Sequence, residues 1–342
     1  MASSTQSPRP TPEHIFEVLN AYHHTAALKS AIELDLFTAI DDGSHEVMQI
    51  AQSVKASERG VRILCDFLTI LGFVNKEEGR YTLGADGALF LSRRSPSYMG
   101  TIIGFLGNEN HQKNLARLTE AVRRGGTAGE NGDNREPQDE LWVSFARSMA
   151  PLAIPNAIFI ASLVGAQEGK ACRVLDIAAG HGMYGITIAQ QNLKAEITAL
   201  DWPAVLEVAK ENAQNAGVSA RYTIRPGSAF QAELGMGYDL VLLTNIFHHF
   251  DQETCVELMR RVHDALKPTG KAITVEFIPN EDRVSPTRDA AFSLLMLVGT
   301  DAGEAYTFAE YEKMFASAGF VRTTLHQGSE ATQRVVIAEK AK

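Results

Sequence analysis

The chain has 342 residues, of which 45% are hydrophobic and 21% are charged, a composition usual for a globular protein. This length favours two domains over a single one. The net charge of −9 argues against nonspecific nucleic-acid binding, which requires clustered lysine and arginine. The three cysteines lie far apart and form no CxxC pair, which argues against a disulfide framework and against a zinc site.

The N-terminal residues have neither the cationic start nor the apolar core of a signal peptide, and residues 1–10 are expected to be disordered. No run reaches the roughly 20 apolar residues that a membrane-spanning helix needs. We therefore expect a soluble, cytoplasmic protein.

Residues 11–105 are predicted to form an all-α, winged-helix-like domain with one small hairpin. Apolar side chains recur at helical spacing from Ile15 to Leu28. The segment 73–83 reads as two short strands with a glycine in the turn between them. Further helices are expected at about 31–41, 46–54 and 57–72.

Residues 106–165 are predicted to form a helical region that connects this domain to the next and contributes to a substrate site. Helices are expected within 97–125 and 139–165, which are mostly apolar. The stretch 125–137 is rich in glycine, asparagine and charge, which predicts a mobile surface loop.

From residue 166 to 342, predicted strands alternate with helices, which favours a doubly wound, mostly parallel α/β sheet. The last two strands are joined by a short loop that contains Gly328, so this pair should be antiparallel. Strands are expected near 173–177, 196–200, 220–224, 238–243, 271–277, 319–326 and 333–339. Helices are expected near 184–192, 203–216, 251–266 and 307–318.

The most informative stretch runs from Val174 to Gly182, where an apolar strand ends in a glycine-rich turn. Gly180 and Gly182 would let the backbone approach a ligand closely. Asp201 closes the next strand, where an acid can accept hydrogen bonds from both hydroxyls of a ribose. These residues together predict a cofactor that contains adenosine.

Two cofactors fit this pattern. The GxGxxG spacing of Gly180, Gly182 and Gly185 also occurs in nicotinamide-binding units, so an NAD-dependent dehydrogenase stays open as an alternative. Asp176, however, would place a negative charge beside a pyrophosphate, whereas a ligand with an ammonium and a sulfonium tolerates it. The antiparallel end of the sheet also favours S-adenosylmethionine.

The chain resembles the class I S-adenosylmethionine-dependent small-molecule O-methyltransferases, of the plant caffeate and hydroxyindole type and their bacterial polyketide-tailoring relatives. The resemblance covers nearly the whole chain and implies a homodimer formed through the N-terminal domain. It rests on Leu200-Asp201-Trp202-Pro203, on Asn245-Ile246-Phe247-His248-His249-Phe250 and on Val275-Glu276-Phe277-Ile278-Pro279.

This resemblance implies a role for each matching residue. His248 would be the general base that removes the proton of a phenol or enol, and Glu276 would orient it. Phe145 and Met149 match a Phe-x-x-x-Met helix that surrounds the reacting methyl group and the acceptor. The residues expected to bind the cofactor are Asp176, Gly180, Gly182, Asp201, Trp202, Ser228, Ala229 and Phe230. The residues expected to line the acceptor site are Phe145, Met149, Phe292 and Met296.

The chain departs from the family pattern in three places. Ser228 and Ala229 stand where the family often has an acid near the adenine. His249 and Phe250 replace an aspartate and a tryptophan after the catalytic histidine. A second glutamate of the family falls on Ala305, with Glu304 one position away.

Several of these residues also have structural readings. His248 would fit a structural or cofactor-side role, and Glu276 a strand-end acid paired with an arginine. Asp176 would fit an acid that binds turn amides. Phe145 and Met149, at i and i+4, would fit a core stripe. The apolar run 292–298 would fit core or a dimer surface.

The predicted function is methyl transfer from S-adenosylmethionine to a hydroxyl of a small, fairly apolar, natural-product-like acceptor. No residues have metal-ligand spacing, so we expect no metal requirement, and we expect neither nucleic acid nor membrane as a partner. C- or N-methylation and non-methylating chemistry on the same fold remain alternatives. A ligand-responsive DNA-binding regulator is disfavoured, because the presumed recognition helix 57–71 carries Arg59 and Arg62 as its only cations.

Overall fold

The computed structural model describes residues 11–129 and 139–341, and it divides into two compact units between Ile103 and Gly104. The prediction of disorder for residues 1–10 lies outside the described residues. Each unit has a hydrophobic core of its own.

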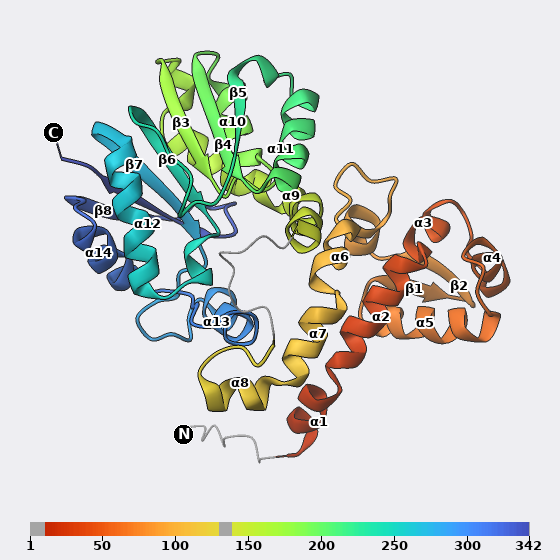
Figure 1. Ribbon diagram of the computed structural model, residues 1–342. Helices are drawn as coiled ribbons and strands as arrows, with labels where there is room; N and C mark the ends of the chain where they lie inside the picture. Colours follow the sequence, from red (N-terminus) through yellow and green to blue (C-terminus); the bar gives the residue numbers. More distant parts are fainter. Residues whose placement is uncertain (1–10, 130–138, 342) are drawn as a thin grey trace, which may run out of the picture. The chain divides into compact units, whose positions relative to one another are not determined.

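The N-terminal unit consists of short helices followed by a hairpin, as predicted (Figure 1). The hairpin is antiparallel, with Val74 opposite Leu83. The expected helix over 31–41 is wrong, because Asp35 adopts a left-handed conformation with φ 56° and separates two helices. The elements are α1 (Glu13–Asn20), α2 (Tyr22–Glu33), α3 (Leu36–Asp41), α4 (Val47–Ser53), α5 (Glu58–Ile70), β1 (Val74–Glu77) and β2 (Arg80–Leu83).

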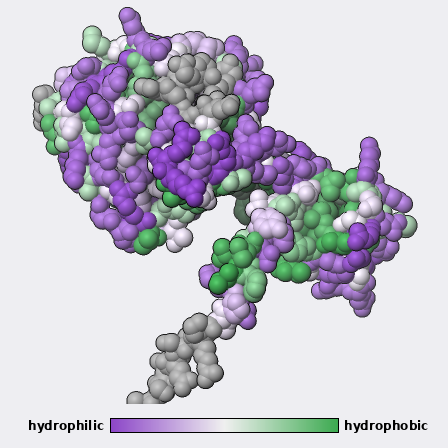
Figure 2. Space-filling view, turned by 60° about the horizontal axis from the view of Figure 1, so that its bottom comes forward, coloured by the Kyte–Doolittle hydropathy of each residue, from purple (hydrophilic) through white to green (hydrophobic). Residues whose placement is uncertain are grey.

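Helix α1 buries none of its side chains, although its sequence is amphipathic. Its apolar residues Ile15, Phe16 and Leu19 are 58–63% exposed. Figure 2 shows hydrophobic side chains gathered on the visible surface of the N-terminal unit. Large exposed apolar patches usually mark an interaction surface.

The middle of the chain is helical but broken into short pieces before the long helix α9 (Asp139–Leu163). The prediction of a mobile surface loop over 125–137 is wrong for its first residues. Thr127 is buried, its amide donates to the Thr300 carbonyl at 2.8 Å, and its hydroxyl donates to the Val298 carbonyl at 2.7 Å. Residues 130–137 of that prediction lie outside the described residues. The short helices are α6 (Ile103–Leu106), α7 (Glu109–Ala116) and α8 (Leu118–Arg124).

A seven-stranded sheet forms the centre of the second unit, in the order β5-β4-β3-β6-β7-β9-β8. The first five strands along the chain are parallel, and β9 runs antiparallel to both β7 and β8, as predicted. The strands are β3 (Cys172–Ile177), β4 (Ala195–Asp201), β5 (Tyr222–Pro226), β6 (Tyr238–Thr244), β7 (Leu266–Glu276), β8 (Arg322–His326) and β9 (Arg334–Glu339).

Helices cover both faces of this sheet, which makes it doubly wound (Figure 1). Helices α9, α10 (Met183–Gln191) and α11 (Pro203–Asn215) pack on one face, and α12 (Gln252–Ala265) and α14 (Phe308–Ser317) on the other. The carboxyl ends of the parallel strands share one edge, where open α/β sheets bind their ligands.

Helix α13 (Thr287–Gly299) was not predicted from the sequence. Its residues 292–298 are almost all apolar, so they carry no helical alternation of polar and apolar side chains. Met296 and Val298 are buried, and α13 contacts α7 and α8, whereas Leu294 of the same run is 49% exposed.

One helix, Glu140–Leu163, is long and apolar enough by length and composition to cross a membrane, contrary to the expectation that no segment qualifies. This helix packs against α10 and α11 and buries Ala157 and Ile160 in the core of the second unit. Arg147 on its outer face forms a bidentate ion pair with Glu211 of α11, at 2.9 and 3.2 Å. These contacts are those of a core helix in a globular protein.

Candidate active site

The turn after β3 depends on glycine at two positions. Gly180 and Gly182 have φ angles of 57° and 74°, in the left-handed region that side chains disfavour. A Cβ on Gly182 would lie 2.5 Å from the hydroxyl oxygen of Tyr222, so no side chain fits there. A Cβ on Gly180 would meet nothing closer than 3.9 Å, because this residue faces a cavity.

Asp201 ties the end of β4 to this turn. Its Oδ2 accepts a hydrogen bond from the Gly180 amide at 2.8 Å, and its Oδ1 accepts one from the Trp202 amide at 2.7 Å. Burial raises the pKa of this carboxyl to about 6, and the two amides oppose that rise. Asp201 also lines the cavity, so the unused lone pairs of its oxygens are available to a ligand.

Asp176 lies behind the turn and not in the cavity wall. It is fully buried at the end of β3, and its Oδ2 accepts a hydrogen bond from the Gly185 amide at 3.3 Å. Its Oδ1 has no partner among the described residues. Burial raises the pKa of this carboxyl to about 8, and the nearby Asp201 adds to the rise. This geometry favours the structural reading, with the bound amide in the first turn of α10.

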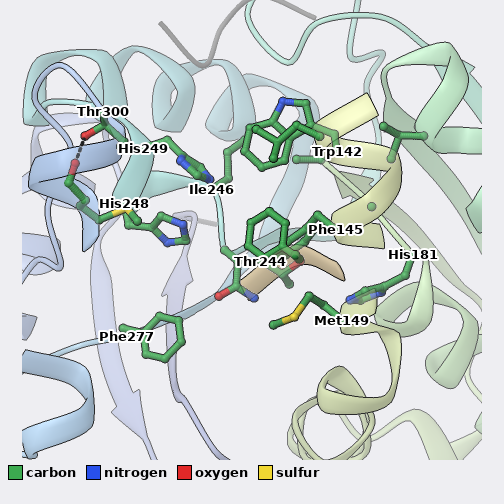
Figure 3. A pocket seen from close by; sticks show the side chains of 18 of the residues that line it. Trp142, Phe145, Met149, His181, Thr244, Ile246, His248, His249, Phe277 and Thr300 are labelled. Atoms are coloured by element: carbon green, nitrogen blue, oxygen red, sulfur yellow. Dashed lines mark hydrogen bonds between the residues drawn. The ribbon is translucent and has the colours of Figure 1, made fainter. Parts of the chain in front are cut away.

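A cavity of about 430 Å³ opens at the carboxyl edge of the sheet, entirely within the second unit (Figure 3). It brings together most of the residues predicted from sequence. Gly182, Asp176 and Glu276 are outside its wall. The predicted residues that line it are Phe145, Met149, Gly180, Asp201, Trp202, Ser228, Ala229, Phe230, His248, Phe292 and Met296.

His248 and Glu276 form a buried pair beside the cavity. His248 lies in a single turn of 3₁₀ helix after β6, and Glu276 is the last residue of the neighbouring strand β7. The distance from His248 Nδ1 to Glu276 Oε2 is 2.5 Å. The other oxygen, Oε1, accepts hydrogen bonds from the amides of Phe247 at 2.9 Å and His248 at 3.4 Å.

This pairing sets the chemistry of the imidazole. An ionised carboxylate is only an acceptor, so Nδ1 carries the proton of a neutral His248. The lone pair is then on Nε2, which has no hydrogen-bond partner among the described residues. Glu276 is fully buried and would also stabilise the imidazolium that forms when Nε2 takes a proton. The carboxylate of Glu276 therefore fixes the orientation of the His248 ring and which ring nitrogen carries the proton.

Aromatic rings form the wall of the cavity next to His248. Phe277 and Phe292 stack with centroids 3.9 Å apart, and the Phe292 ring meets the His248 ring edge-on at 4.9 Å. Helix α9 supplies the opposite wall with Trp142, Phe145 and Met149 (Figure 3). Trp142 was not predicted, although it precedes Phe145 by three residues and therefore shares its face of the helix.

A chain of hydrogen-bonded polar side chains at the cavity was also not predicted from the sequence. Gln333 donates from Nε2 to Asn245 Oδ1 at 2.5 Å, and Asn156 donates from Nδ2 to Gln333 Oε1 at 3.0 Å. Asn245 and Gln333 line the cavity, as do His181 and Tyr184. Burial lowers the pKa of His181 to about 4. The position of Asn245 inside the motif around His248 was the one signal that pointed to this group.

Glu304 does not take the place of the glutamate missing at position 305. Its carboxylate pairs with Arg283 at 2.6 Å on the surface, and it does not line the cavity. Ala305 is fully buried. Within residues 11–129 and 139–341, no group of three or more His, Cys, Asp or Glu could hold a metal ion.

Comparisons with known proteins agree on one family. A family model for the O-methyltransferase domain matches residues 158–321, and one for the O-methyltransferase dimerisation domain matches residues 16–93. A crystal structure of a candidate O-methyltransferase from Nostoc punctiforme is 47% identical, with a TM-score of 0.93, and the match covers 97% of this chain and 100% of that one.

Two further proteins are similar over their full lengths. A 3-hydroxy-5-methyl-1-naphthoate 3-O-methyltransferase from Streptomyces sahachiroi is 28% identical, and the match covers 99% of this chain and 98% of the relative. Human N-acetylserotonin methyltransferase, solved in complex with S-adenosylmethionine, shares the fold, with 21% identity, a TM-score of 0.85 and 100% of both chains covered.

Proposed function

The chain belongs to the O-methyltransferase family, and from this premise we propose that it methylates a hydroxyl on a small aromatic acceptor, with His248 as the general base. S-adenosylmethionine is the methyl donor. The observation that carries the proposal is the His248–Glu276 pair, which lies beside an aromatic cavity that is continuous with the glycine turn and Asp201.

The residues at the turn fit this donor. Gly180 presents open backbone to the cavity, and the Asp201 carboxylate retains acceptor capacity for two ribose hydroxyls. Trp202 and residues 228–230 line the same part of the cavity and would contact the remainder of the adenosine. When bound, S-adenosylmethionine would supply a methyl group on a sulfonium, and in-line attack of the acceptor oxygen on the methyl carbon would release S-adenosylhomocysteine as the neutral thioether.

His248 supplies the base that this acceptor requires. A phenol is a weak nucleophile until it loses its proton, and a neutral imidazole can remove that proton near neutral pH. Glu276 holds Nδ1–H, so the proton from the acceptor goes to Nε2. The carboxylate then balances the charge of the imidazolium, and the aromatic walls keep water away from both groups.

The cavity also supports an aromatic acceptor. Phe277, Phe292, Phe145 and Trp142 offer ring faces and edges on two sides of it, which suits a flat, apolar molecule. The Streptomyces sahachiroi relative acts on a hydroxylated naphthoate, which is such a molecule.

We further propose a homodimer formed through the N-terminal unit, in the cytoplasm, with neither nucleic acid, membrane nor metal as a partner. The match to a dimerisation domain and the exposed apolar side chains of α1 support the homodimer. On helix α5, Arg62 is already paired with Asp66 at 2.9 Å, which leaves Arg59 as the single unpaired cation of that described helix and disfavours contact with DNA phosphates.

Replacement of His248 tests the proposal. In the variant His248→Ala, methyl transfer to hydroxylated naphthalenes, followed by mass spectrometry, should fall by about 10²- to 10⁴-fold, while calorimetry shows S-adenosylmethionine binding within about twofold of wild type. His326→Ala is the matched control, because His326 lies on β8 and outside the cavity wall. Undiminished turnover in His248→Ala would refute the general base and favour a carbon acceptor that is already an enolate.

A further inference from the structure

One cation lines the acceptor side of the cavity, among aromatic and aliphatic side chains. Of the described residues in the cavity wall, Arg288 is the single lysine or arginine. It lies in the first turn of α13, four residues before Phe292 and seven before Leu295. Residues at this spacing share one face of a helix, so the guanidinium continues the row of acceptor-facing side chains.

Contacts with two fixed groups hold this side chain at the cavity. The guanidinium carbon of Arg288 lies 5.5 Å from the centre of the Phe277 ring, over its face. Nη1 donates to the Thr332 carbonyl at 3.4 Å. Thr332 is itself held in place, because its amide donates to Asn156 Oδ1 at 2.8 Å.

Arg288 forms no ion pair within the described residues, and its polar contacts there are the Thr332 carbonyl and the Phe277 ring. Arg283, in contrast, binds Glu304 at 2.6 Å and Glu310 at 2.8 Å. Asp289, the next residue after Arg288, is buried and forms no ion pair with it. Burial raises the pKa of Asp289, and the charges of Arg334 and Arg288 oppose that rise.

An unbroken series of ring contacts connects the cation to the base. Phe277 lies under the guanidinium, Phe292 stacks on Phe277, and the Phe292 ring meets His248. His248 and Arg288 both line the cavity, so an acceptor bound there can direct its hydroxyl to one and another group to the other. The planar fork of a guanidinium matches the two oxygens of a carboxylate.

We propose that Arg288 selects acceptors that carry a carboxylate on the aromatic ring system, at the end away from the hydroxyl that faces His248. This inference rests on the proposed function and narrows its substrate class to hydroxylated aromatic acids. Arg288 contributes to acceptor binding and not to the chemical step.

The test compares matched acceptors with and without the carboxylate. The probes are hydroxylated benzoates, naphthoates and anthracene carboxylates, each beside the same hydroxylated ring without the acid. Calorimetry in the presence of S-adenosylhomocysteine measures their affinity, and turnover with S-adenosylmethionine measures KM and kcat. For at least one pair, wild type should favour the acid by about tenfold or more in affinity.

Two variants and a control test whether Arg288 causes the preference for the acid. Arg288→Gln should raise the KM of the acid by about tenfold, leave its kcat within about twofold and change the neutral acceptor little. Arg288→Lys should keep part of the preference. Arg322→Gln, on the far edge strand β8, removes one exposed charge and should change neither acceptor.

The inference is overturned if no acid in the series binds better than its neutral partner, or if Arg288→Gln weakens both members of a pair equally. Methyl transfer to neutral acceptors alone would overturn it and leave the proposed function intact. Absence of S-adenosylmethionine binding, in contrast, would refute the proposed function itself.

Discussion

The two halves of the cavity are built from different parts of the chain. The donor half consists of backbone and short polar contacts at the ends of the neighbouring strands β3 and β4: Gly180, in a turn that Gly182 shapes from outside the cavity wall, and Asp201. The acceptor half consists of side chains on helices α9 and α13, which are far apart in the sequence, together with Phe277 directly after β7.

The two halves therefore differ in how strictly the structure constrains which residue can occupy a position. In the donor half, left-handed backbone and a lack of space fix residue identity, as at Gly182. In the acceptor half, large side chains of many kinds could fill the same wall. We therefore expect substitutions in the donor half to act on cofactor affinity, and those in the acceptor half to act on acceptor KM, with the His248–Glu276 pair acting on kcat.

The largest effect is expected for Glu276→Gln, at the junction of the two halves. The amide would offer a donor to Nδ1, which favours the tautomer with the proton on Nε2 and removes the base. We expect kcat to fall by about 10³-fold, or about 4 kcal/mol.

The kcat pH profile of Glu276→Gln distinguishes this role from a structural one. A positioning role predicts a changed profile for the residual rate, with donor affinity retained. Loss of thermal stability with an unchanged profile per folded molecule would instead assign Glu276 to the fold.

Asp201→Asn should affect the donor half alone. The variant keeps the size of the side chain, but its amide nitrogen cannot accept from the amide of Trp202 or Gly180. The dissociation constant of S-adenosylmethionine, measured by calorimetry, should rise by about 30-fold, or about 2 kcal/mol. At saturating donor, kcat should stay within about twofold of wild type. A large loss of kcat would contradict the claim that the donor half acts on cofactor affinity alone.

Asp176→Asn tests whether this acid binds the donor or the turn. The pKa of Asp176, raised to about 8, lies above its value in the unfolded chain, so the folded state holds the proton more tightly. Wild-type stability should therefore fall as the pH rises from about 4 to 8, by up to about 1.4 kcal/mol per pH unit. In urea denaturation at a series of pH values, the free energy of unfolding of the variant should lack this dependence on pH.

Donor affinity gives the second readout for Asp176→Asn. A turn-binding acid that is protonated near neutral pH predicts a change of less than about threefold, because the asparagine oxygen can still accept from the Gly185 amide. A loss of tenfold or more would make Asp176 a ligand of the positively charged donor.

Met149→Ala should have the smallest effect. Met149 lines the acceptor side of the cavity next to Phe145, and its loss removes apolar contact with the acceptor. Acceptor KM should rise by about fivefold, or about 1 kcal/mol, while the affinity for S-adenosylmethionine stays within about twofold. An equal loss in both constants would contradict the separation of the halves.

The same division explains what the sequence could predict. The alternation of strands and helices, the hairpin at 73–83 and the antiparallel final strands follow from local patterns, and the structure confirms them. The glycines with positive φ and Asp201 at the end of β4 could be predicted from the sequence, because each belongs to a short local motif. The sequence also placed His248 and Glu276 together, since both follow neighbouring strands of one sheet.

The features that the sequence did not predict depend on contacts between segments that are distant in the chain. Thr127 looked like part of a surface loop, but two hydrogen bonds to the end of α13 bury it, and no local pattern encodes such a contact. Helix α13 lacked periodicity because Leu294, on its exposed face, is apolar like the buried Met296 and Val298. Trp142, Gln333 and Arg288 meet at one cavity from three distant segments, so only the assembled structure shows them as neighbours.

The central claim is that His248 removes the proton of the acceptor hydroxyl. The most direct test measures the ratio of wild-type to His248→Ala kcat across acceptors that differ in the acidity of this hydroxyl, at fixed pH and saturating donor. The account predicts a large ratio for weakly acidic naphthols that falls toward one for nitro-substituted acceptors already ionised at the assay pH. A ratio that stays constant across the series would contradict it.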